Sequence, residues 1–291
     1  MAGAIVSAEM QRLRPRLALA VALALVVAAC ASSGRAGGSA GPSAGIEHAT
    51  GATDLILRFE EGGGFVPPGF IVTEAPSFSL YGDGTAIFRD PSTARPYQAG
   101  SVYPGVPFQI VRLDEDQVQA LLEFAIGPGG LGLARAQYEL PIADAPTATF
   151  TLVIRGTGKT VSVNGLGLGG QQGGDAAVLA QLAGLKARLT TFGDEIADEQ
   201  PWRPDRYRGI LSEGGSTPPT TWPWSTIMPA DFLKHDGPND PRFPIRTMSP
   251  AEVAALGVTG LEGGAQGFTF HGPDGRTYEF YLRPLLPDES Y

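Results

Sequence analysis

The sequence is poor in the residues that form disulfides, metal centres and nucleophilic active sites. It contains one cysteine and three histidines among 291 residues. One cysteine excludes an internal disulfide, and no histidine or cysteine pair has the spacing of a zinc site. We therefore expect a body that is stabilised by an ordinary hydrophobic core and that holds no metal and no cofactor.

Long apolar runs are scarce as well. The run from Leu17 to Ala29 would span about 20 Å as a helix, whereas a helix that crosses a bilayer needs about 20 apolar residues. Three arginines, the first of them Arg12, precede this run. The pattern is typical of a signal peptide over residues 1–29, whether translation starts at Met1 or at Met10.

The single cysteine follows this apolar run directly. The sequence Val27-Ala28-Ala29-Cys30 resembles the lipobox of bacterial lipoproteins. The resemblance implies cleavage before Cys30, a thioether-linked lipid on its sulfur and acylation of the new N-terminus, and two or three acyl chains anchor a protein stably. An ordinary secretory signal with an incidental cysteine is the alternative. The Gly/Ser/Ala-rich segment 30–49 is typical of a flexible tether, so we expect a lipid-anchored protein on the extracytoplasmic face of a cell membrane.

The charge of the chain argues against one class of partner, and its glycine and proline content indicates the fold class. The whole chain carries a net charge of −9, and loss of the signal segment with its three arginines and one glutamate leaves −11. An acidic body argues against nucleic acid as a partner. The 40 glycines and 25 prolines indicate many turns and few long helices. We predict an α+β fold of antiparallel hairpins with two or three short helices, in two small units that either share one core or have separate cores.

Residues 50–195 have the pattern of an α+β domain. Apolar and polar residues alternate over Asp54–Glu60, which predicts a strand, and Phe70–Thr73 is expected to form another. Gly82, Asp83 and Gly84 tolerate the positive φ of a tight turn and predict a hairpin. Its strands are expected at Ser77–Tyr81 and Thr85–Arg89, and a long loop is expected from there to about Ile110.

Helical periodicity predicts two helices in the same domain. In LDEDQVQALLEFA, the residues Val118, Leu121, Leu122 and Ala125 share one face. The second helix is expected at about Asp175–Leu189, with Asp175 as N-cap and an apolar stripe of Val178, Leu182, Leu185 and Leu189. A hairpin that turns at Gly156–Gly158 is expected between the two helices.

The last third of the chain has a different composition. Ten prolines fall between residues 200 and 250, so residues 196–248 are predicted to be an extended Pro-rich connection without regular structure. In 249–291, the sequence Ser-Pro-Ala-Glu from Ser249 to Glu252 forms a capping box that predicts a short helix. A final hairpin is expected to pair GFTF with RTYEFYLR.

About a third of the chain resembles a known group of domains. Residues 75–163 contain APSFSLYGDGTAIF, the first predicted helix, DAPT and TLVIRGTGKTVSV. This series is similar to an uncharacterised family of small domains in secreted bacterial proteins, with the pattern P-x-[FY]-x-[LI]-Y-x-D-G-T. That family has no established activity, so the resemblance implies a fold and a secreted location only.

Several motifs that suggest chemistry have simpler interpretations. IRGTGKT lacks the first glycine of a phosphate-binding loop, because Val153 stands in its place, and it lies between two predicted strands. The segment Asp236–Pro241 is rich in oxygen ligands, but its prolines break the calcium-loop pattern and turn chemistry explains the same residues. We expect His48 in the tether, His235 in a loop and His271 at a hairpin rim, with no catalytic residue among them.

The aromatic residues are the best candidates for a binding face. Trp202, Tyr207, Trp222 and Trp224 lie within 23 residues of one another in the Pro-rich segment. On a surface they would form a stacking platform for a glycan or an envelope protein. Alternatively, they fasten the Pro-rich segment to the core, which is the more frequent location of large aromatic side chains.

Three functions remain open at this point. The first is a non-catalytic binding or interaction module tethered to a membrane. The second is a cell-wall or glycan hydrolase with two carboxyl groups in a cleft beside the tryptophans. The third is a structural subunit of an envelope assembly, which requires a large exposed apolar patch.

Replacing Cys30 by serine removes the proposed lipid acceptor. We expect the C30S variant to incorporate no fatty acid, whereas the neighbouring S32A variant is labelled like the wild type. Metabolic labelling with an alkyne fatty acid measures this directly. Equal labelling of C30S and wild type would contradict lipidation at this residue.

Overall fold

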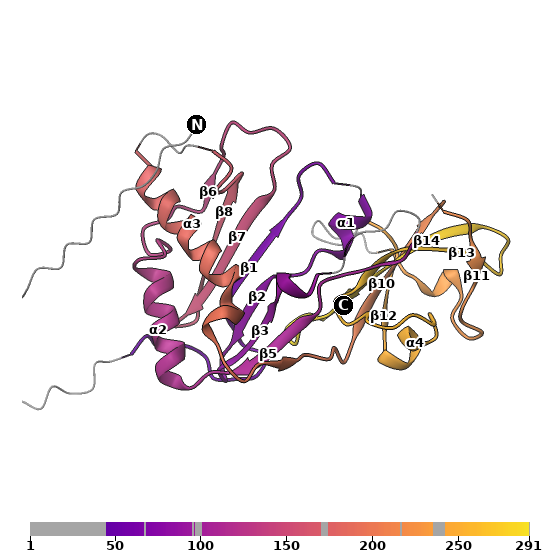
Figure 1. Ribbon diagram of the computed structural model, residues 1–291, viewed down its shortest axis with the longest axis horizontal. Helices are drawn as coiled ribbons and strands as arrows, with labels where there is room; N and C mark the ends of the chain where they lie inside the picture. The colour runs from indigo at the N-terminus through magenta and orange to yellow at the C-terminus, as the bar shows by residue number, and fades with distance from the viewer. Residues whose placement is uncertain are drawn as a thin grey trace, which may run out of the picture. The chain divides into compact units, whose positions relative to one another are not determined.

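Two β-sheets and four helices make up the described part of the protein (Figure 1). The computed structural model describes residues 45–66, 68–94, 96, 101–169, 174–215, 217–234 and 242–290. The predicted signal peptide, Cys30 and nearly all of the predicted tether lie outside these residues, as do His235 and the segment Asp236–Pro241. No helix of the described residues is long and apolar enough to cross a membrane.

The first sheet has eight strands in the order β6-β8-β7-β1-β2-β3-β5-β9. Its strands are β1 (Leu55–Gly62), β2 (Phe78–Tyr81), β3 (Thr85–Arg89), β5 (Phe108–Arg112), β6 (Gln137–Tyr138), β7 (Thr147–Ile154), β8 (Thr157–Asn164) and β9 (Gln200–Pro201). The second sheet has the order β11-β13-β14-β10-β12, with β4 paired to β13. Its strands are β4 (Tyr103–Pro104), β10 (Tyr207–Glu213), β11 (Thr220–Thr221), β12 (Ile245–Met248), β13 (Ala265–His271) and β14 (Thr277–Pro284).

The helices are α1 (Pro68–Thr73), α2 (Glu115–Ile126), α3 (Ala176–Thr190) and α4 (Pro250–Ala254). The structure is therefore mostly β with some helices, which is consistent with the α+β class. Most strand pairs are antiparallel, and the hairpins β2–β3, β7–β8 and β13–β14 were all predicted. The β7–β8 turn lies at Arg155–Gly156 and not at the predicted Gly156–Gly158. The pairs β6–β8 and β11–β13 are parallel, so the sheets are not built from hairpins alone.

Helices α2 and α3 cover one face of the first sheet (Figure 1). The four residues predicted to share a face of α2 are all buried, and Asp114 and Gln117 form a capping box at its start. In α3 the buried stripe begins at Leu179 rather than at Val178, so the predicted stripe was wrong by one residue there. Asp175 is the N-cap of α3, but its carboxylate makes no capping hydrogen bond and pairs with Arg135 instead.

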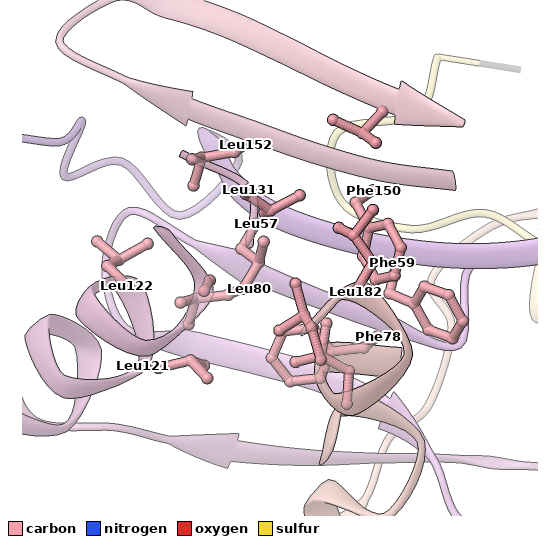
Figure 2. Close-up of a cluster of buried hydrophobic side chains, with 14 of the residues drawn as sticks. Leu57, Phe59, Phe78, Leu80, Leu121, Leu122, Leu131, Phe150, Leu152 and Leu182 are labelled. Carbon is pink, nitrogen blue, oxygen red and sulfur yellow. The ribbon is translucent and has the colours of Figure 1, made fainter. Parts of the chain in front are cut away.

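The first hydrophobic core lies between this sheet and its helices. Figure 2 shows side chains of β1, β2 and β7 directed toward leucines of α2 and α3. The rings of Phe59 and Phe150 stack across neighbouring strands with their centroids 5.0 Å apart. Alternate residues of each strand enter this core because successive side chains of a strand point to opposite faces.

The tight turn before β3 lies where it was predicted, but only Gly84 of its three predicted residues has a positive φ. Gly84 has a φ of 87°, which favours glycine, and its amide donates to the Tyr81 carbonyl. The Asp83 carboxylate accepts a hydrogen bond from the Thr85 amide at 2.9 Å. A Cβ at Gly82 would lie 2.5 Å from the Ala49 carbonyl oxygen. These three residues are therefore structural.

The expectation of a strand at Phe70–Thr73 was wrong, because these residues belong to helix α1. Pro68 occupies the first helical position, where its missing amide hydrogen costs nothing. The Thr73 hydroxyl donates back to the Gly69 carbonyl at 3.0 Å. A Cβ at Gly69 would come within 2.2 Å of the Tyr281 ring, so only glycine allows α1 to lie this close to β14.

Two expected loops contain strands. The segment before Ile110 was expected to be a loop, but β5 begins at Phe108 and pairs with β3 over five residues. The Pro-rich connection was expected to lack regular structure, but β10 is a seven-residue strand that pairs with β12 and β14. Both strands avoid proline themselves, and each gains its hydrogen bonds from partners far away in the sequence.

The folded body begins before the predicted boundary at Thr50. The Ile46 amide donates to the Gln119 side chain at 2.7 Å, and the Ile46 carbonyl accepts from the same side chain at 2.9 Å. His48, expected in the tether, lies 3.2 Å from the Glu115 carboxylate. Part of the segment assigned to the tether is therefore attached to helix α2.

The C-terminal residues after β14 connect the two sheets. Leu286 is buried with Tyr81, Ile87 and Phe108 on the face of the first sheet opposite the helices. Arg58 of β1 donates to Asp288 at 2.7 Å. The tail of the second sheet is thus packed against the first.

Arg283, in strand β14 of the second sheet, binds the same C-terminal tail. Its two Nη groups donate to the two oxygens of Glu289 at 2.7 and 2.8 Å, and its Nε donates to the Glu74 carbonyl at 2.6 Å. The side chains of this pair are only 8% and 16% exposed. Burial raises the pKa of Glu289, but the hydrogen bonds and charge of Arg283 outweigh it and hold the pKa below its ordinary value.

Replacing Arg283 by methionine leaves the Glu289 carboxylate buried without its cation. We expect the free energy of unfolding to fall by about 3 kcal/mol, because removing one partner of a buried ion pair is strongly destabilising. The control R276M breaks the pair Arg276–Glu213, in which both side chains are more than 60% exposed, and it should cost at most about 1 kcal/mol. Urea unfolding measures both changes.

The difference in unfolding free energy between wild type and R283M should depend on pH. A carboxyl group with a lowered pKa in the folded state stabilises the protein above its unfolded pKa of about 4.3, and this contribution is lost as the pH falls through the folded pKa. The difference between wild type and R283M should therefore shrink below about pH 4. A difference that is equally large at low and neutral pH would contradict the role of Glu289.

Candidate functional site

The tryptophan pair of the Pro-rich segment is buried in the core of the second sheet. Trp222 and Trp224 are 9% and 7% exposed, and their rings meet edge to face with centroids 5.1 Å apart. The Trp222 indole N–H donates to the Ile227 carbonyl, and that of Trp224 donates to the Glu252 carbonyl. Each indole has its polar group satisfied inside the protein, so neither ring offers a stacking face.

The other two aromatic candidates are also part of the framework. Tyr207 is buried beside the tryptophan pair, and burial, with the nearby charge of Glu262, raises the pKa of its hydroxyl to about 12. Trp202 is half-buried and lies elsewhere, edge to face with Phe108 at 5.5 Å. The hypothesis of an exposed aromatic platform is thus wrong for the tryptophan pair, and the four residues do not form one cluster.

A cavity of about 290 Å³ lies where the first sheet, helix α1 and the second sheet meet. Arg89 from β3, Phe70 from α1, Tyr103 from β4 and Gln266 from β13 contribute to its wall. The Gln266 amide group donates to the Thr73 hydroxyl at 2.7 Å and fastens α1 to β13. This contact and the close approach of Gly69 to β14 hold helix α1 in place as one wall of the cavity.

Arg89 is the unusual residue of this cavity. Its Nε is buried and has no hydrogen-bond partner, and no carboxylate of the described residues forms an ion pair with it. The guanidinium lies over the Phe108 ring at 4.5 Å from the centroid. Burial, together with the positive charge of Arg283, lowers the pKa of Arg89 to about 10. The site therefore contains a cation whose charge no described carboxylate compensates.

Two carboxylates line the same cavity. Glu61 is paired with Lys186 of α3. Within the described part of the chain, the Gly63 amide is the one donor to the Glu74 carboxylate, at 3.0 and 3.2 Å from its two oxygens. Burial raises the pKa of Glu74, the Gly63 hydrogen bond opposes this, and the nearby charge of Glu60 adds to it. Neither carboxylate is close enough to Arg89 to form an ion pair.

A smaller cavity of about 220 Å³ adjoins this group of carboxylates. Glu60, Glu61 and Glu74 line it together with two threonines of β7. Partial burial raises the pKa of Glu60 although Arg58 and Arg283 lower it. Two carboxyl groups with raised pKa values therefore face one small cavity, and no tryptophan lines it.

Two further cavities contain residues that take part in ion pairs. One, of about 910 Å³, lies along β5, where Arg112 pairs with Asp83 and Glu195 pairs with Arg188. Another, of about 410 Å³, lies beside Tyr207 and contains an Arg203–Glu262 contact of 3.9 Å. Among the described residues, no group of three or more histidines, cysteines or carboxylates is placed to hold a metal ion.

The sequence analysis missed Arg89, although the sequence contains a signal for it. In TAIFR, Ala86 and Phe88 enter the first core, whereas Ile87 enters the cluster on the opposite face. The strand is therefore buried on both faces, and Arg89 shares a face with Ile87. A charged residue at such a position requires a partner or a function.

Replacing Arg89 by methionine removes the uncompensated charge and keeps an apolar side chain of similar length over Phe108. We expect the free energy of unfolding to rise by about 1–2 kcal/mol, because the gain from removing a buried cation exceeds the lost cation–π contact. The control R112M changes an exposed arginine and should lie within about 0.5 kcal/mol of the wild type. Destabilisation of R89M by more than about 2 kcal/mol would assign Arg89 a purely structural role.

Comparison of the chain with protein-family models, with curated proteins and with solved structures gave no match. The function of the cavity has to be argued from its own residues.

Proposed function

We propose that the protein is a non-catalytic binding module, held at the extracytoplasmic face of a membrane by lipid on Cys30, and that the Arg89 cavity is its ligand site. The anchor rests on the signal-like N-terminal segment, the lipobox and the Gly/Ser/Ala-rich segment that follows. The site rests on the structure of the folded body.

The uncompensated guanidinium of Arg89 carries this proposal. Burying a charge without a partner is costly, and folded proteins rarely keep such a group unless it has a function. An arginine in a cavity provides up to five N–H donors and a permanent positive charge. A ligand with an anionic group supplies the charge and the acceptors that the described residues do not provide.

The glycan hydrolase remains the second candidate. The tryptophans are buried, so a cleft beside them does not support it. The observation in its favour is the small cavity with Glu60 and Glu74, since a raised carboxyl pKa suits a general acid.

A structural subunit is the weakest of the three candidates. It requires one continuous apolar patch on the surface. The most exposed large apolar side chains, Phe65, Leu133, Leu168 and Leu233, come from four different loops of the described chain. This distribution does not favour a single large contact surface.

Ligand-observed NMR separates the first two candidates. The lipidated mature protein in a neutral detergent is mixed with short envelope glycans and small organic acids. We expect the wild type to bind members of the panel, R89M to lose this binding, and every compound to be recovered unchanged.

If the protein is a glycan hydrolase, the same NMR samples should give a different result. A glycan would be consumed, and consumption would stop in E74Q but not in E123Q, which changes an exposed glutamate of α2. Such turnover, or binding that is equally strong in R89M, would contradict the proposed function.

A further inference from the structure

The charges around the Arg89 cavity restrict the kind of anion that fits. Among the described residues that line it, the Arg89 guanidinium is the one cation, and Glu61 and Glu74 contribute carboxylates to the same wall. A ligand with a single negative charge at Arg89 is attracted to the site. A second negative charge on the ligand would face the carboxylates and be repelled, since unit charges a few ångströms apart interact strongly in a partly desolvated cavity.

The remaining wall is suited to an apolar group. Phe70 and Tyr103 both line the cavity, and both are half-buried, so part of each ring is exposed. Their ring centroids are 6.3 Å apart with a tilt of 36°. Val66, Val106 and Ala265 add further apolar surface. An anion as small as inorganic phosphate would leave this surface in contact with water.

The volume sets the size of the ligand. A space of about 290 Å³ is at the lower end of the range for small-molecule sites. It corresponds to about ten water molecules at their volume in the liquid, and hence to a molecule of about ten non-hydrogen atoms. A polysaccharide chain or a folded partner could place only one small group in it.

We propose that this cavity binds a small organic monocarboxylate, whose carboxylate pairs with Arg89 and whose apolar part packs against Phe70 and Tyr103. The planar guanidinium presents N–H groups in a fork that matches the two oxygens of a carboxylate. The inference rests on the proposed binding function and specifies its ligand class.

The test is isothermal titration calorimetry on the lipidated mature protein in a neutral detergent at low salt. Benzoate is the main probe, and benzamide is its uncharged counterpart of the same shape. Acetate keeps the carboxylate without the apolar part, and phthalate adds a second carboxylate. Inorganic phosphate tests for a general anion site.

We expect benzoate to bind at least about tenfold more tightly than each of the other four probes, since a charge-assisted hydrogen bond is worth about 1.5–3 kcal/mol, or roughly 10- to 150-fold. R89M should lose benzoate binding by a similar factor. The control R112M, with an exposed arginine on β5, should bind benzoate like the wild type. F70L should weaken benzoate but leave acetate unchanged.

Three results would overturn this inference: equal binding of benzamide and benzoate, undiminished benzoate binding by R89M, or tighter binding of phthalate or phosphate. The glycan panel separates this failure from a failure of the proposed function. If an uncharged glycan fragment binds the wild type but not R89M, the binding module stands and the monocarboxylate class is wrong. If no compound of either set binds in an Arg89-dependent way, both proposals fail.

Discussion

The buried ion pairs of the C-terminal tail are the contacts on which the arrangement of the cavity depends. Arg283 lies at the end of β14, and its guanidinium joins the tail carboxylate of Glu289 to the backbone of Glu74. In the first sheet, Arg58 and the Tyr81 hydroxyl both donate hydrogen bonds to the Asp288 carboxylate of the tail. These contacts hold the segment before β2 against the second sheet, and Glu74 in that segment forms part of the cavity wall. The ion pairs thus compensate the charges of the tail and of the two arginines that bind it, whereas no described carboxylate pairs with Arg89.

Local sequence patterns were sufficient to predict the helices and turns whose conformation depends only on their own residues. Helix α2 has its capping box and its periodic apolar face within one stretch, and α4 begins with Ser249 and Glu252 placed as predicted. The hairpin turn at Asp83 needs only residues that tolerate its backbone conformation. Strands β5 and β10 were missed because their hydrogen-bond partners are far away in the chain. Helix α1 was misassigned because the short apolar run Phe70–Val72 fits a strand and a helix equally well.

The candidate site was largely invisible for the same reason. Its wall combines α1, β3, β4 and β13, and no local motif indicates that these four segments meet. The sequence identified the tryptophans as notable but gave no means of deciding which way Trp222 and Trp224 face. The structure places them in the core, with hydrogen bonds to backbone carbonyls that no pattern reveals. Arg89 was the one site residue with a readable signal, a charge in a strand whose neighbours are buried on both faces.

The central claim is that Arg89 is an anion receptor and not a structural cation. The most direct measurement is the NMR resonance of its Nε–H group in arginine-labelled protein, followed while benzoate is added. The account predicts that this resonance shifts in a saturable way, whereas that of Arg283, already bound to Glu289 and Glu74, stays in place. An Arg89 resonance that does not respond to benzoate, or that moves no more than that of Arg283, would contradict the account.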